Sequence, residues 1–170
     1  MTSRVYNFGA GPSMIPTPVM MKIQHEFLDY NGLGVSIVEL SHRLPLFKEI
    51  LDEAESIFRE LTGLPDNYRL IFMHGGAQMQ FSAVPLNLMS LKSHKGSYLI
   101  TGRWGTLAEK EARRYGKTEV LADGKEFEYR RIPDYDISML DQNTSYVHLT
   151  SNNTLYGTRW HVFPETNDIP

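Results

Sequence analysis

The stretch SYLITGRWGTLAEKEARRYGKTEVL, residues 97–121, combines two kinds of periodic pattern. A short run at 97–101 is typical of a buried strand, the segment 104–115 has helical spacing, and 118–121 is again typical of a strand. A strand, a helix and a second strand in this order indicate parallel neighbours joined by a crossover helix. This stretch therefore predicts a parallel sheet covered by helices.

The sequence on either side continues the alternation of helices and strands. The clearest helical pattern, at residues 45–62, places apolar side chains along one stripe and Lys, Glu and Asp on the opposite face. Pro85 lies inside another apolar segment, where it should kink the helix or end it early. We expect helices at residues 17–30, 45–62 and 78 to about 89, and further strands at 68–73 and 146–150.

Together these elements predict an α/β fold, a mostly parallel sheet with helices on both faces. Residues 1–16, rich in Gly and Pro, are expected to form an N-terminal arm rather than a helix. The chain stops after a strand and a turn, so we expect the sheet to need further strands and helices for completion.

Composition restricts the classes of function. The chain has 17 basic and 20 acidic residues and a net charge of −3, which does not favour nucleic acid or anionic membranes as partners. It has no apolar run of membrane-spanning length and no signal-peptide pattern, so a cytoplasmic location is expected. It has no cysteine, and its six histidines lack metal-ligand spacing, so we expect neither thiol chemistry nor a metal site.

Two glycines, Gly75 and Gly76, stand between the expected strand at 68–73 and the helix that follows. Glycines let the backbone approach a ligand closely, and free amides at a helix N-terminus attract anions. The loop is therefore a candidate phosphate cradle, although it matches neither the GxGxxG nor the P-loop pattern. A tight turn without any ligand is the alternative.

Other candidate groups follow the ends of expected strands, where α/β proteins bind ligands. Trp104 could stack on a flat ring, or it could be a packing residue. Asn152, Asn153 and Thr154 could orient a polar ring substituent, or they could form a plain turn. Arg43, after Ser41 and His42, could bind an anionic group while Ser41 caps the helix, or it could be a surface arginine.

Five blocks, in order, resemble the phosphoserine aminotransferase family, a class V branch of the fold-type I transaminases that use pyridoxal 5′-phosphate (PLP). The resemblance covers essentially the whole chain and is carried by FGAGPSMIP, NGLGVSIVELSHR, HGGAQMQFSAVPLNL, TGRWGTLAEKEA and SNNTLYG. It implies that residues 17–170 are part of the large PLP-binding domain. It also implies that the lysine forming the Schiff base lies beyond Pro170, so that no catalytic residue is expected in this chain and the chain alone should be inactive.

The resemblance also implies roles for single residues. Gly76, Ala77 and Gln78 would contact the PLP phosphate, Trp104 would stack on the pyridine ring, and Thr154 would contact the ring oxygen. His42 and Arg43 would receive the acidic group of the substrate across a homodimer interface. The implied reaction is amino transfer between glutamate and 3-phosphohydroxypyruvate, giving phosphoserine and 2-oxoglutarate in serine biosynthesis.

Two positions depart from the family pattern. Gln78 stands where some members carry arginine, and Ala10 stands where others place a serine near the substrate, so the substrate preference is less defined than the reaction class. Another fold-type I aminotransferase or a desulfurase is therefore an alternative. A folded or dimerising fragment without catalysis is the alternative outside the enzymes.

Overall fold

The structure is a computed structural model that describes residues 4–170. The chain divides into two compact units, Met1–Phe72 (unit 1) and Met73–Pro170 (unit 2). Each unit is described by itself below. Among the described residues, no helix is long and apolar enough to cross a membrane.

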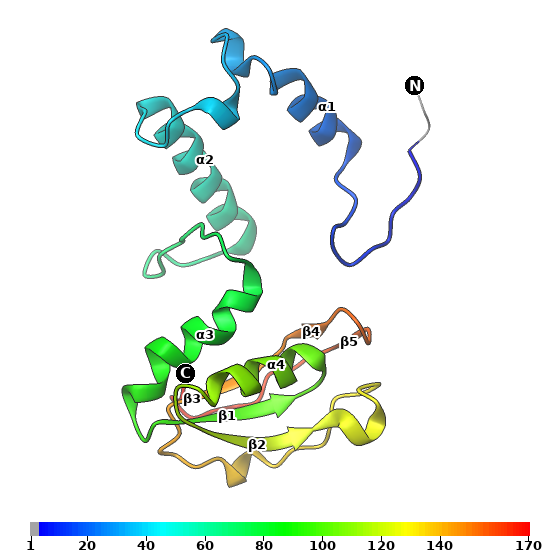
Figure 1. Cartoon of the computed structure of the whole chain (residues 1–170), viewed down its shortest axis with the longest axis vertical. Helices are drawn as coiled ribbons and strands as arrows, with labels where there is room; N and C mark the ends of the chain where they lie inside the picture. The colour runs from blue at the N-terminus through cyan, green and yellow to red at the C-terminus, as the bar shows by residue number, and fades with distance from the viewer. Residues whose placement is uncertain (1–3) are drawn as a thin grey trace. The chain divides into compact units, whose positions relative to one another are not determined.

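A three-stranded parallel sheet forms the centre of unit 2. Its strands β1 (Lys95–Ile100), β2 (Lys117–Asp123) and β3 (Tyr146–Leu149) lie in the order β2-β1-β3 (Figure 1). A short antiparallel pair, β4 (Asn152–Asn153) and β5 (Thr158–Arg159), follows β3 directly. The strands expected at 97–101, 118–121 and 146–150 are thus present with small shifts of their ends.

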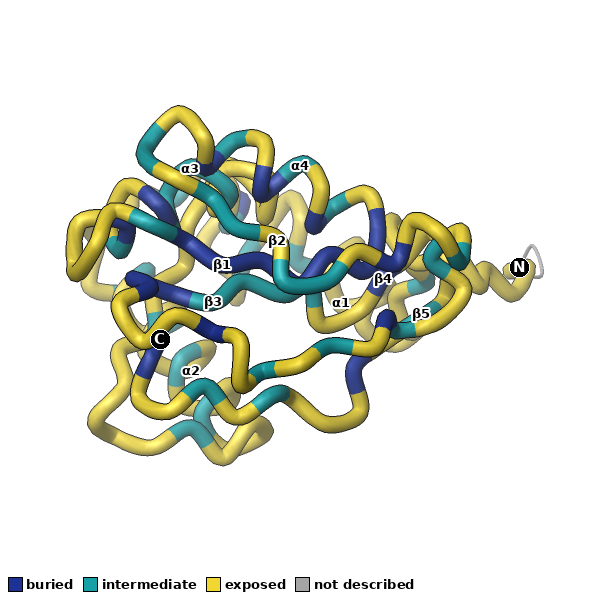
Figure 2. Tube along the Cα trace, turned by 90° about the horizontal axis from the view of Figure 1, so that it is seen from below, coloured by how far each residue is buried: buried dark blue, intermediate teal, exposed yellow. Residues whose placement is uncertain are grey.

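Helices α3 (Gly76–Leu88) and α4 (Arg103–Ala112) pack on one face of this sheet. The core between them is a cluster of buried side chains that β1 dominates, and β1 appears as an almost continuous buried segment in Figure 2. The expected α/β fold with a parallel sheet is confirmed. The buried members of the cluster are Met89, Tyr98, Ile100, Ala108, Ala112 and Tyr146.

Pro85 lies inside α3 without ending it. The helix continues to Leu88, close to the expected end at about 89, and then tightens into a 3₁₀ turn, η3 (Met89–Leu91). Of the two effects expected of Pro85, a kink or an early end, the early end does not occur. A proline removes one backbone donor from a helix. Here its ring is fully buried, and burial of apolar surface is itself stabilising.

Unit 1 contains helices α1 (Thr17–Glu26) and α2 (Pro45–Thr62), with 3₁₀ turns η1 (Tyr30–Gly32) and η2 (Ile37–Glu39) between them. Helix α2 has the expected bounds, whereas α1 ends four residues before the expected position at 30. The amide of Tyr30 bonds the carbonyl of Val35 at 2.8 Å, and Asp29 accepts from the amide of Gly34 at 2.7 Å. These turn contacts replace the last helical hydrogen bonds.

The strand expected at residues 68–73 is absent from the structure. The segment has no regular secondary structure, it forms no ladder with any of the residues 4–170, and the side chains of Ile71, Phe72 and Met73 are more than half exposed. An apolar run becomes a strand only when another strand pairs with its backbone. The described chain supplies no such partner.

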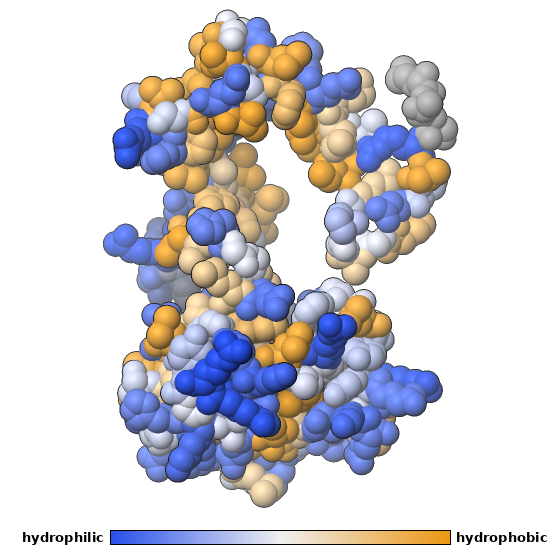
Figure 3. Space-filling view, in the orientation of Figure 1, coloured by the Kyte–Doolittle hydropathy of each residue, from blue (hydrophilic) through white to orange (hydrophobic). Residues whose placement is uncertain are grey.

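Apolar side chains remain at the surface of unit 1, as the orange patches over α1 and α2 show (Figure 3). No residue of α1 or α2 is buried, and even the stripe of α2 is exposed, with Leu51 at 41% and Leu61 at 80%. Ser36 is the one buried residue within 4–72. The amphipathic pattern of α2 thus predicts its helix correctly, but the described residues do not cover its apolar face.

Candidate functional site

The start of α3 is a glycine turn that leaves amides free. Gly75 and Gly76 have φ values of 102° and 65°, a region that side chains other than glycine rarely adopt. A Cβ on Gly75 would lie 2.4 Å from Sδ of Met79, a flexible side chain that could move aside, so it is the backbone conformation that favours glycine here. No side chain caps the helix, and the first amides of a helix have no intrahelical partner. Ala77 and Gln78 therefore present N–H groups at the positive end of a helix dipole.

Trp104 lies in the first turn of α4, immediately after β1. Its indole Nε1–H donates to Oγ1 of Thr154 at 3.3 Å, which links the start of α4 to the turn after β4. The guanidinium of Arg103 lies 5.9 Å from the centre of the indole ring. The expected pair of ring-contacting residues, Trp104 and Thr154, is therefore in direct contact.

Asn153 supports the turn that carries Thr154 through buried hydrogen bonds. It is buried, and its amide donates to the hydroxyls of Thr101 at 3.1 Å and Thr158 at 3.0 Å. A Cβ on Gly102 would lie 2.4 Å from Oδ1 of Asn153, so this close approach requires glycine at position 102. The sequence analysis treated Asn153 as a possible ring contact, whereas the structure places it in a supporting position.

A cavity of about 410 Å³ lies in unit 2 at the ends of β1 and β3. Three of the expected cofactor residues, Ala77, Gln78 and Trp104, line it together. The other two, Thr154 and Gly76, are not among the lining residues. Thr154 accepts a hydrogen bond from Trp104, and Gly76 precedes Ala77 in the helix. The remaining lining residues are Phe81 and the run His148–Ser151.

His148 lines this cavity and was not singled out by the sequence analysis. It faces Tyr98 across the β1–β3 register, with the two ring centres 5.2 Å apart. Burial lowers the pKa of His148 to about 4, so the imidazole is neutral at pH 7. Its Nδ1 is buried and has no hydrogen-bond partner among the described residues. The signal available in the sequence is a histidine inside an otherwise apolar strand.

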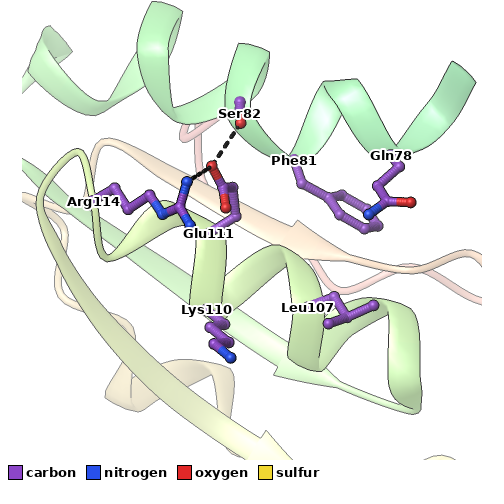
Figure 4. A pocket seen from close by; sticks show the side chains of 7 residues that line it. All are labelled: Gln78, Phe81, Ser82, Leu107, Lys110, Glu111 and Arg114. Carbon is purple, nitrogen blue, oxygen red and sulfur yellow. Dashed lines mark hydrogen bonds and ion pairs between the residues drawn. The ribbon is translucent and has the colours of Figure 1, made fainter. Parts of the chain in front are cut away.

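A neighbouring pocket of about 380 Å³ lies between α3 and α4 (Figure 4). Gln78 and Phe81 line both pockets, whereas the far end of this one is polar. Glu111 accepts from Ser82 at 2.8 Å and pairs with Arg114 at 3.2 Å, as the dashed lines show. The hydrogen bond from Ser82 to Glu111 therefore links α3 to α4.

His42 and Arg43 belong to unit 1, where they lie in the turn before α2. They line a pocket of about 440 Å³ together with residues of the first turns of that helix. The expected capping role of Ser41 is wrong, because the N-cap of α2 is Leu44 and Ser41 instead accepts a hydrogen bond from the amide of Arg43 at 3.3 Å. Pro45 in the first helical turn has no amide hydrogen that would need a cap.

The lysines offer no nucleophile to the cavity of unit 2. No lysine of the described chain is among its lining residues. Lys95, at the start of β1, is held by Asp141 at 2.7 Å and by Glu119 at 3.1 Å, and these carboxylates raise its pKa. Within residues 4–170 no group of three or more His, Asp or Glu side chains could hold a metal ion.

A sheet of this topology with free helix amides and an indole at its carboxyl edge is what a PLP-binding large domain would present. The sequence profile described as "Aminotransferase class-V" matches residues 5–168. The chain belongs to the class V aminotransferase family.

Several relatives of this chain carry a more particular name. Phosphoserine aminotransferase of Bacillus anthracis (strain A0248) is 45% identical over 170 residues, which cover 100% of this chain and 47% of that protein. Phosphoserine aminotransferase of Alkalihalobacillus alcalophilus is 42% identical over 170 residues. This chain spans about half the length of the curated relatives it matches.

Solved structures agree with this assignment. Phosphoserine aminotransferase from Bacillus circulans subsp. alkalophilus superimposes with a TM-score of 0.90 at 37% identity, over 98% of this chain and 46% of that one. A PLP-bound phosphoserine aminotransferase from Trichomonas vaginalis gives a TM-score of 0.85 at 27% identity, over 96% of this chain and 46% of that one.

Proposed function

We propose that this chain forms part of a PLP-dependent phosphoserine aminotransferase, with residues 1–16 as an arm and 17–170 as part of the large domain. One observation carries the proposal. Ala77 and Gln78, at the uncapped start of α3, and Trp104 line a single cavity in a chain whose relatives carry that name. Phosphate and aromatic ring are the two parts of PLP that such groups recognise.

The residues present fit PLP. The phosphate would bind at the start of α3, where the helix dipole favours a dianion and where Gly75 and Gly76 keep side chains away from it. The pyridine ring would stack on Trp104. When bound, PLP supplies the electron-withdrawing ring that makes transfer of an amino group possible.

Thr154 has a definite chemical role in this arrangement. Its Oγ1 already accepts the indole N–H of Trp104 at 3.3 Å, so its own hydroxyl hydrogen is left to donate. A donor at this position suits the ring oxygen of PLP. The same hydrogen bond fixes the orientation of the indole, so the stacking surface and the hydroxyl are positioned together.

The substrates follow from the proposed family member rather than from the cavity. We propose that glutamate and 3-phosphohydroxypyruvate are the reactants, that His42 and Arg43 bind the acidic group of the substrate, and that the working enzyme is a cytoplasmic homodimer in which Arg43 reaches the partner's site. An arginine fork binds carboxylate and phosphate oxygens in pairs, which suits both anions.

The proposal is tested by adding PLP to the 170-residue chain and recording the visible spectrum before and after borohydride reduction, followed by peptide mapping. We expect reversible binding that inorganic phosphate weakens, no adduct at one specific lysine, and no glutamate-dependent turnover. A matched addition of pyridoxal, which lacks the phosphate, should bind much less. Failure of PLP to bind would contradict the cofactor assignment.

Activity requires a completed chain, which we define as this sequence joined to the part of the Alkalihalobacillus alcalophilus relative that it does not cover. We expect the completed chain to convert phosphoserine and 2-oxoglutarate. Alanine and cysteine, offered in parallel, separate this proposal from the alternatives of another aminotransferase or a desulfurase. Preference for either over phosphoserine would contradict the proposed substrate.

A further inference from the structure

The turn that carries Thr154 has little support of its own. It consists of residues 154–157, which connect β4 to β5, and all four residues are exposed. A hairpin of two such short strands is only marginally stable in water. The hydrogen bond from Trp104 to Thr154 is also exposed and, at 3.3 Å, is longer than the usual distance for an N–H donor. The position of Thr154 therefore depends on other contacts of the turn.

Tyr156 supplies such contacts from the middle of the turn. A Cβ on Gly102 would lie 3.2 Å from Cδ2 of Tyr156, so the tyrosine ring lies directly against the N-cap of α4, two residues before Trp104. The same ring meets the ring of Tyr129, with the two ring centres 5.0 Å apart and the planes inclined by 52°. Aromatic pairs at this separation attract each other. The ring of Tyr156 thus connects the turn to two neighbouring segments.

Tyr129 is held in an unusual backbone conformation. Its φ is 60°, and the preceding Glu128 has a φ of 51°. A bulky residue rarely adopts this left-handed region, and it does so only where surrounding contacts determine the conformation. The amide of Tyr129 donates to the carbonyl of Gly124 at 3.0 Å, its carbonyl accepts from the hydroxyl of Thr158 at 3.5 Å, and its side chain packs against the core. Tyr129 is therefore a fixed support beside the turn.

We propose that Tyr129 and Tyr156 are positioning residues that act through Thr154. The hydrogen bonds of Asn153 hold the ends of the turn, and the ring pair holds its middle against the start of α4. This arrangement keeps the hydroxyl of Thr154 at the indole of Trp104. Neither tyrosine lines the cavity, so both act without contact to the cofactor. The consequence for PLP rests on the proposed function, in which Thr154 and Trp104 contact its ring.

The indole resonances of the ¹⁵N-labelled chain report the position of Thr154 without any ligand. The chain has two tryptophans, Trp104 and Trp160, and therefore gives two indole N–H resonances. Thr154→Val removes the acceptor and shows where the Trp104 resonance lies when the hydrogen bond is absent. Tyr156→Ala should move the Trp104 resonance most of the way to that position, while the resonance of Trp160 should stay in place.

Three further variants make the test specific. Tyr156→Phe keeps the ring and should leave the Trp104 resonance as in the wild type. Leu155→Ala removes another exposed apolar side chain of the same turn and should also leave it unchanged. Tyr129→Gly removes the supporting ring, and the chain should stay folded because glycine adopts a φ of 60° without strain. It should shift the Trp104 resonance as Tyr156→Ala does.

Binding of pyridoxine 5′-phosphate measures the consequence for the cofactor. This probe has the ring, hydroxyl and phosphate of PLP but no aldehyde that could react with lysines. Tyr156→Ala and Tyr129→Gly should bind it about threefold to tenfold more weakly, as expected for one displaced hydrogen bond, and Tyr156→Phe should bind it as the wild type does. Binding of inorganic phosphate should be equal in all variants, because the start of α3 is unchanged.

The two measurements separate this inference from the function on which it rests. If the wild type does not bind pyridoxine 5′-phosphate, the cofactor assignment and its link to the tyrosines fail, whereas the indole resonances still decide whether the tyrosines position Thr154. If Tyr156→Ala and Tyr129→Gly leave the Trp104 resonance in place, the positioning role is overturned and the cofactor assignment stands. An equal shift in Leu155→Ala would also overturn the role, since any change in the turn would then displace Thr154.

Discussion

The two units of this chain reach their structures by different means. Unit 2 surrounds a buried strand with two helices and two further strands, and its core residue Leu99 is completely inaccessible. Unit 1 has two helices, yet neither buries a single residue. The difference shows that regular helices in this chain do not imply a core beneath them.

Local signals account for α2. Pro45 lies in its first turn, Gly63 ends it with a φ of 64°, and two pairs four residues apart, Lys48–Asp52 and Glu55–Arg59, brace its exposed side. Each such signal contributes a few tenths of a kcal/mol to about 1 kcal/mol. The burial of side chains that stabilises unit 2 has no counterpart here.

A matched pair of leucines should give the largest contrast. Leu99→Ala removes a fully buried side chain from β1 and should lower the free energy of unfolding of unit 2 by about 2 to 5 kcal/mol. Leu51→Ala removes a side chain of α2 that is 41% exposed, so it should change the free energy of unfolding by less than about 0.5 kcal/mol. Urea titrations followed by circular dichroism measure both, and similar losses would mean that α2 is packed in solution.

A substitution of Arg43 tests whether unit 1 binds the substrate while unit 2 binds the cofactor. In the completed chain, Arg43→Ala should raise the KM for phosphoserine about tenfold to a hundredfold, or about 1.4 to 3 kcal/mol for a charge-assisted contact. PLP should remain bound, because the proposed cofactor contacts lie in unit 2. Steady-state kinetics and the visible spectrum report the two effects separately, and an unchanged KM would remove Arg43 from the site.

Acid should weaken unit 2 through His148. Its pKa in the folded chain is about 4, below the ordinary 6.5, so the unfolded chain binds the proton first. The stability that the neutral ring contributes is complete above pH 6.5 and is lost as the pH falls towards 4. Because part of the ring reaches solvent, we expect a loss of about 1 to 2 kcal/mol.

The measurement compares the free energies of unfolding of wild type and His148→Leu between pH 7 and pH 4. The free energy of unfolding of His148→Leu relative to the wild type should increase as the pH falls, whereas that of His161→Leu should follow the wild type. A constant difference across this range would show that the folded chain does not hold His148 neutral.

The smallest expected effect concerns Trp104. Trp104→Ala should weaken PLP binding to the 170-residue chain about threefold to tenfold and shift the absorption of bound PLP, since stacking contributes about 0.5 to 1.5 kcal/mol. Trp104→Phe should have a milder effect because it keeps an aromatic face. If the alanine variant binds PLP with unchanged affinity and spectrum, Trp104 is a packing residue.

Periodicity predicted the elements whose stability is local or whose partners lie within the chain. The helix at 45–62 and the strand around Tyr98 belong to this group. The run at 68–73 carries the same kind of apolar signal but finds no strand to pair with among the described residues, and a sequence pattern does not state which partner is present. The end of α1 was misjudged because the turn formed by Asp29 and Gly34 competes with the helix.

The candidate site was predicted in part, and for a physical reason. Trp104 could be located because strand ends are recognisable along a chain, whereas Ala77 was named only through the family resemblance; both line the cavity. His148 was missed because its significance depends on the β1–β3 register and on an unpartnered atom, neither of which is encoded in its neighbours along the sequence. For Asn153 the sequence left a ring contact and a plain turn as alternatives, because its hydrogen bonds to Thr101 and Thr158 are visible only in three dimensions.

The hydrogen bond from the buried Asn153 amide to Thr101, beside Gly102, has a consequence for the speed and thermodynamics of ligand capture. It locks the turn that carries Thr154 against the start of α4, so the indole and hydroxyl need not find each other when a ligand arrives. A preorganised template of this kind spends little conformational entropy on association. Its encounter with a flat ring should therefore resemble docking onto a rigid surface, with little slow rearrangement after the first collision.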